Sequence, residues 1–218
     1  MSKTQTKKQA SNRNLIFWVG GGVIGLGLIF LLALSIAGEP EVDTSIAFGQ
    51  VIVEGESLPF FADPSAADPA LGLTAPTVRG GDWMGNDFTI SPDGRPKILV
   101  LLAHWCPHCQ AEVPRIVEWI DSGGLPAQVD LYGLTVLTNR VRDGSTWPPQ
   151  DWLEREGWTS PVIMDNEEGS VVSAFGLVST PLYVVLDGEN KNLGRFSGEV
   201  GTSGLVTMAN LALSSLEG

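Results

Sequence analysis

The chain has 218 residues, enough for one domain of ordinary size with accessory segments. Its 25 acidic and 13 basic residues give a formal net charge of -12, and so acidic a chain lacks the basic face that a nucleic-acid partner requires. Its two cysteines lie three positions apart, too close to staple distant loops, so we expect them to serve redox chemistry or metal binding.

The N-terminal part predicts a membrane anchor. Residues 1–14 carry a cluster of basic side chains. Residues 15–37 contain no charge and are long enough, at about 1.5 Å per residue, to cross the roughly 30 Å hydrocarbon layer of a membrane. Acidic residues follow, so the positive-inside rule predicts a single-pass protein of the cell membrane, with a cytoplasmic N-terminus and an extracytoplasmic catalytic domain. A cleaved secretory signal ending at Ser35-Ile36-Ala37 is the alternative, and it also exports the domain.

Residues 38–72 predict an extracytoplasmic linker. They are acidic and contain Pro40, Pro59, Pro64 and Pro69, a composition typical of a spacer. Within this segment, residues 46–53 alternate in polarity and are rich in β-branched side chains. We therefore expect one accessory strand there, docked on the main sheet.

Residues 73–218 predict one α/β domain, because buried strands alternate with helical segments. Asp187-Gly188 separates the last two strands and favours a hairpin, so the sheet should be mixed. The expected strands are residues 98–103, 129–137, 182–186 and 193–197, and the expected helices are residues 107–120, 150–156, 170–175 and 202–216.

The segment with the most chemical information is Trp105-Cys106-Pro107-His108-Cys109, which follows an apolar strand and opens a helix. At a helix N-terminus, unsatisfied backbone N–H groups and the positive end of the helix dipole favour a thiolate. Cys106 is therefore the expected nucleophile. Cys109, one turn further along, is placed to attack a mixed disulfide on Cys106 and is the expected resolving cysteine.

This segment resembles the active site of thioredoxin-superfamily oxidoreductases, and its Pro-His pair matches the oxidising DsbA type. Over roughly residues 73–200 the chain also resembles the membrane-anchored TlpA/ResA-like group. The matching positions are Ala75-Pro76, Glu112, Pro114, residues 161–165, Phe175-Gly176, Thr180-Pro181 and residues 186–188.

The resemblance implies a thioredoxin-like fold and roles for several positions. Pro114 falls where the family kinks its first active-site helix. Thr180-Pro181 matches the cis-proline that the family places opposite the redox pair, where its backbone binds an extended substrate segment. Trp105 is expected to give the substrate an apolar contact beside the disulfide.

One position departs from the family pattern. Six residues before the first cysteine, where the family's thioredoxins carry a buried acid, this sequence has Val100. The proton acceptor for Cys109 is therefore open. Glu112 is one candidate and water another, and we favour an exposed structural role for Glu112.

The two histidines differ in expected role. His108 lies between the cysteines, where it can donate to the Cys106 thiolate and pair with its charge, so we count it with the catalytic residues. His104 ends a strand, and packing and tuning of the site are equally good readings of it. The expected packing residues of an insertion are Trp147, Trp152 and Trp158.

These features predict an enzyme that exchanges thiols and disulfides with protein substrates, needs no cofactor or metal, and is recharged by a membrane redox partner. The Pro-His pair favours disulfide donation, and a reductase serving cytochrome c maturation is the alternative. A metal carrier using Cys106, Cys109, His104 and His108 is less favoured, because a zinc site draws its second ligand pair from a separate segment. A binding module with an inert disulfide is a further alternative, and the oligomeric state is left open.

Overall fold

The computed structural model describes residues 47–62, 66–138 and 144–217. The expected cytoplasmic tail, residues 1–14, and the expected transmembrane helix, residues 15–37, lie outside these ranges. Among the helices that the described ranges contain, none has the length and apolar character required to span a membrane.

The main sheet has five strands in the order β6-β5-β4-β7-β8. β4, β5 and β6 run parallel, whereas β7 and β8 run antiparallel to their neighbours, which confirms the expected mixed sheet. The strands are β4 (Lys97–Leu102), β5 (Asp130–Thr135), β6 (Val162–Met164), β7 (Leu182–Leu186) and β8 (Asn192–Ser197).

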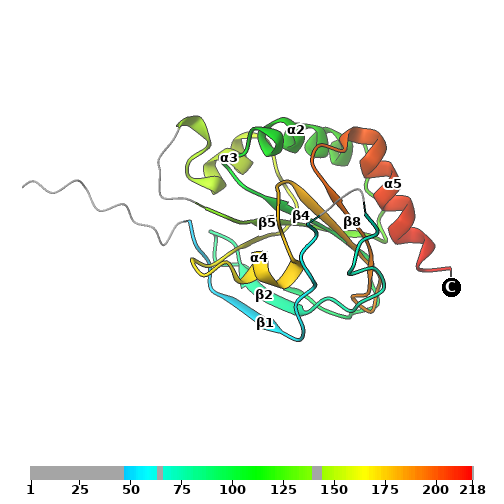
Figure 1. Cartoon of the computed structure of the whole chain (residues 1–218). Coiled ribbons are helices and arrows are strands. Elements are labelled where there is room, and N and C mark those ends of the chain that lie inside the picture. The colour runs from blue at the N-terminus through cyan, green and yellow to red at the C-terminus, as the bar shows by residue number, and fades with distance from the viewer. Residues whose placement is uncertain (1–46, 63–65, 139–143, 218) are drawn as a thin grey trace, which may run out of the picture. The chain divides into compact units, whose positions relative to one another are not determined.

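Helices cover both faces of this sheet (Figure 1), and for this reason every residue of β4 is buried. Ile98 and Val100 belong to the core beneath α2 and α5, and Leu99 and Leu101 to the core beneath α4, as the twofold side-chain period of a strand requires. The helices are α2 (Pro107–Asp121), α3 (Pro149–Arg155), α4 (Ser170–Phe175) and α5 (Gly201–Ser214), and η2 (Gly144–Thr146) is a short 3₁₀ turn.

The accessory strand forms, but not where we expected it. β1 (Val51–Glu54) pairs antiparallel with β2 (Thr77–Gly81), which pairs with β3 (Asp87–Ile90) in a separate sheet of three strands. β1 therefore pairs with β2 and not with a strand of the main sheet. The sequence analysis did not identify β2.

The expected linker also needs correction, because its described part packs into the domain. Leu58, Phe61 and Ala70 are buried in the core that α4 covers. Arg195 of β8 is 4% exposed and forms an ion pair of 2.6 Å with Asp68. The residues after position 57 therefore belong to the folded unit, and the domain does not begin at residue 73.

Candidate active site

The two cysteines lie at the junction between the end of β4 and the start of α2. Cys106 is the N-cap residue of α2, and Pro107 occupies the first helical position, where its missing N–H costs no hydrogen bond. Cys109 lies in the first turn of the helix. The side chains are thiols in this structure, with Cys106 6% exposed and Cys109 fully buried. Cys106 is thus the cysteine that a second protein can reach.

The surroundings of the two thiols shift their pKa values in opposite directions. Burial acts to raise the pKa of the Cys106 thiol, but hydrogen bonds from the Thr180 side chain, from Cys109 and from the His108 backbone outweigh it, so that this pKa is lowered. At Cys109, by contrast, burial dominates and raises the pKa of the thiol to about 12. In the reduced pair Cys106 therefore ionises to the thiolate more readily than an ordinary cysteine, and Cys109 less readily.

The loop before β7 faces Cys106. The Thr180–Pro181 peptide bond is cis, as the resemblance implied, and the carbonyl oxygen of Thr180 lies 3.4 Å from the Cys106 sulfur. Ser179 is tied to Ser197 of β8 by a hydroxyl contact of 2.6 Å. The structure thus brings Thr180 and Pro181 next to the redox pair on an anchored loop.

Trp105 is 42% exposed, and its indole N–H donates to the carbonyl oxygen of Leu137 over 2.8 Å. Leu137 is 45% exposed and has a left-handed backbone, with φ of 51°. The sequence analysis did not single it out, since a leucine after a strand carries no signal of this role. Together the two side chains present an apolar surface beside Cys106.

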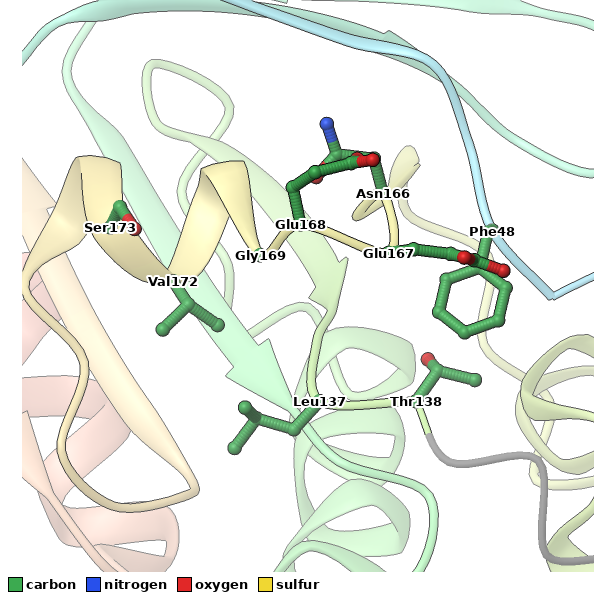
Figure 2. Close-up of a pocket in the computed structure, with 9 residues that line it drawn as sticks. All are labelled: Phe48, Leu137, Thr138, Asn166, Glu167, Glu168, Gly169, Val172 and Ser173. Carbon is green, nitrogen blue, oxygen red and sulfur yellow. The ribbon is translucent and has the colours of Figure 1, made fainter.

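Leu137 also borders a hollow of about 230 Å³ at the carboxyl ends of β5 and β6 (Figure 2). Its apolar lining comes from Phe48, Leu137 and Val172, and its polar rim from Thr138, residues 166–169 and Ser173. Neither Cys106 nor Cys109 lines the hollow, so we assign it no part in the chemistry.

Glu112 is buried, which corrects the expectation of an exposed carboxylate. Its Oε1 accepts hydrogen bonds from the Tyr183 hydroxyl and from the amides of Val200 and Gly201, at 3.0, 3.0 and 2.8 Å. Its Oε2 accepts one from Arg115 at 2.9 Å. Glu112 therefore fixes the start of α5 to α2, and four donors already occupy its oxygens.

Val100 is fully buried, and its partner across the sheet is Tyr183. Burial and the neighbouring Glu112 carboxylate raise the pKa of the Tyr183 phenol, so the phenol stays a hydrogen-bond donor. The hydrogen bond from Tyr183 to Glu112 therefore joins β7 to α2 on the strand next to Val100.

The two histidines lie in different environments. The side chain of His108 is 67% exposed, and its Nδ1 lies 2.8 Å from Oε1 of Glu199 in the turn before α5. His104 is 1% exposed and packs edge-on against Trp147 with ring centroids 5.4 Å apart. Trp152 and Trp158 are buried in the core, as packing residues should be.

Comparison with known proteins agrees with this geometry. The family model described as AhpC/TSA family matches residues 66–193. The secreted antigen MPT53 of Mycobacterium tuberculosis and its counterpart in Mycobacterium bovis are each 30% identical to the chain, over 38% of the chain and 54% of the relative. The chain thus spans about half the length of the curated relatives it matches.

Two solved structures share the fold. A thiol:disulfide interchange protein of the thioredoxin family from Chlorobium tepidum is 22% identical, with a TM-score of 0.52, over 64% of this chain and 95% of that one. The thioredoxin domain of a thiol-disulfide oxidoreductase from Bacteroides vulgatus is 18% identical, with a TM-score of 0.50, over 65% of this chain and 96% of that one. The domain therefore has the thioredoxin-like fold.

Proposed function

Since the chain belongs to the AhpC/TSA family, we propose that it is a thiol/disulfide oxidoreductase that donates the Cys106–Cys109 disulfide to protein substrates outside the cytoplasm. The observation that carries this proposal is the contrast between the thiols. Cys106 has a lowered pKa at the start of α2, and Cys109 is buried with a pKa raised to about 12. Such a contrast gives one attacking sulfur and one internal resolving sulfur.

The reaction balances without a cofactor. A substrate thiolate attacks the sulfur of Cys106, the Cys106–Cys109 bond breaks, and Cys109 leaves as a thiolate that takes up a proton. A second substrate thiolate then attacks the substrate sulfur of the mixed disulfide and releases the Cys106 thiolate. The substrate loses two electrons to the pair, and a membrane redox partner restores the disulfide by taking them.

The direction rests on the thiolate of Cys106. Potentials of about -270 mV for thioredoxin and about -120 mV for DsbA differ by about 150 mV, or roughly 7 kcal/mol for two electrons. Whatever stabilises the reduced thiolate makes the disulfide a stronger oxidant. The backbone amides of His108 and Cys109 at the start of α2 act in this direction. We expect the imidazole of His108 to add to their effect, so disulfide donation is favoured over reduction.

The assignment of roles predicts the pH dependence of alkylation. A lowered pKa means that the thiolate of Cys106 persists to lower pH, so its rate with iodoacetamide should rise well below the free-cysteine pKa of about 8.5. Cys109 should stay slow across this range. Mass spectrometry of the reduced protein, quenched at intervals between pH 4 and pH 9, measures both rates. A Cys106 rate that rises only around the free-cysteine value contradicts the assignment.

We further propose that residues 15–37 anchor the domain in the cell membrane, with residues 1–14 in the cytoplasm. The charge asymmetry around this segment supports that orientation. The relative MPT53 is described as a soluble secreted antigen, which fits export of a related domain. Protease added to intact spheroplasts should digest the domain. Full protection would contradict export, and recovery of a soluble protein beginning near Gly38 would contradict anchoring.

A further inference from the structure

Glu199 lies in the turn between β8 and α5 and brings one carboxylate to two basic side chains of α2. Its Oε1 lies 2.8 Å from Nδ1 of His108, and its Oε2 lies 2.6 Å from Nη1 of Arg115. The sequence separations are 91 and 84 residues, so only the fold creates this cluster. Its members come from the helix that carries the cysteines and from the turn that faces it.

The turn that holds Glu199 is fixed independently of the Glu199 side chain. The next two amides, those of Val200 and Gly201, donate to the buried carboxylate of Glu112, which also binds Arg115. An exposed ion pair ordinarily contributes little to stability, in part because it must immobilise two free side chains. Here the backbone of Glu199 is already in place, and hydrogen bonds from His108 and Arg115 lower the pKa of its carboxyl. Glu199 is therefore a charged acceptor held beside His108.

This inference rests on the proposed function: we propose that Glu199 is a positioning residue, which strengthens the Cys106–Cys109 disulfide as an oxidant by holding the imidazole of His108 in place. The carboxylate engages Nδ1 and leaves Nε2 without a part in this contact. Whenever it carries a proton on each nitrogen, an imidazole held near the thiolate of Cys106 stabilises that thiolate and so favours the reduced pair. Glu199 itself carries a negative charge that repels the thiolate, but its side chain is partly exposed, so solvent screens that repulsion.

Equilibration of the full-length protein with glutathione buffers at pH 7 tests this inference. Replacing Glu199 with glutamine (Glu199→Gln) should reduce the equilibrium constant for oxidation of glutathione by the protein about tenfold, a shift of about 30 mV to more negative potential. Glu118→Gln is the matched control, because Glu118 is an exposed carboxylate on α2. It should leave the constant unchanged.

The same substitution made in a His108→Gln variant shows whether Glu199 acts through His108. In His108→Gln, the further change Glu199→Gln should have no effect, because the imidazole that it positions is gone. An unchanged constant in Glu199→Gln alone, or the same shift in both backgrounds, would overturn the inference. If the wild-type protein does not cycle between disulfide and dithiol at all, the proposed function fails as well. If it cycles while Glu199→Gln has no effect, only the role of Glu199 fails.

Discussion

Replacing Cys109 with alanine is expected to abolish turnover and leave substrate proteins joined to Cys106 through stable mixed disulfides. In the wild type the buried sulfur of Cys109 lies one helical turn from Cys106 and can attack the mixed disulfide from within the protein. In Cys109→Ala the Cys106–Cys109 disulfide cannot form, so mixed disulfides arise when the Cys106 thiolate attacks a disulfide of an oxidised substrate or of the redox partner. Without the Cys109 sulfur to attack them, they persist until an external thiol reaches them. Non-reducing electrophoresis of alkylated cells measures the complexes, and mass spectrometry identifies the captured substrates.

Cys106→Ala provides the control for this capture. It should give no complexes, because the remaining thiol of Cys109 is fully buried and its pKa is raised to about 12. Complexes of equal abundance in the wild type and in Cys109→Ala would refute the resolving role. Complexes that persist in Cys106→Ala would refute the nucleophile.

Replacing Glu112 with leucine is expected to reduce the free energy of unfolding by about 3–5 kcal/mol. The change leaves the Tyr183 hydroxyl and the amides of Val200 and Gly201 without their acceptor, and each buried group left unsatisfied costs about 1–3 kcal/mol. Urea denaturation of the purified reduced protein measures the loss. Glu112→Gln should lose less, because its amide oxygen can still accept hydrogen bonds.

Glu118→Leu is the control for this prediction, since Glu118 is exposed on the same helix and its replacement should change stability by no more than about 0.5 kcal/mol. A Glu112→Leu loss as small as this would mean that the carboxylate does not hold α5 to α2. A normally stable Glu112→Gln protein whose Cys109 reacts more slowly would instead point to Glu112 as the proton acceptor.

The strand and the helix nearest the redox pair could be predicted from the sequence, because the residues that favour each of them are neighbours in the chain. The apolar run that becomes β4 and the Pro107 that opens α2 each act within a few residues. β2, β3 and β6 were missed. β2 contains an arginine and two glycines, and β6 has three residues, so their strand identity comes from partners and not from a pattern of their own.

The surroundings of the cysteines were harder to predict than the cysteines themselves. The burial of Glu112 depends on donors 71 to 89 residues away, and Glu199 reaches His108 across 91 residues. From the sequence alone, a carboxylate one turn after Cys109 is expected to be exposed, because those donors are distant in the chain. In the same way, the proline-rich residues after position 57 predict a spacer, whereas in the structure Arg195 binds Asp68 among them.

The redox potential of the wild-type protein decides most directly whether the Cys106–Cys109 pair donates disulfides. The protein would be equilibrated with glutathione buffers at pH 7, and the fraction of disulfide determined by mass spectrometry after acid quenching. We expect a potential clearly less negative than the roughly -270 mV of thioredoxin and displaced toward the roughly -120 mV of DsbA. A potential at or below that of thioredoxin would contradict disulfide donation and identify the protein as a reductant.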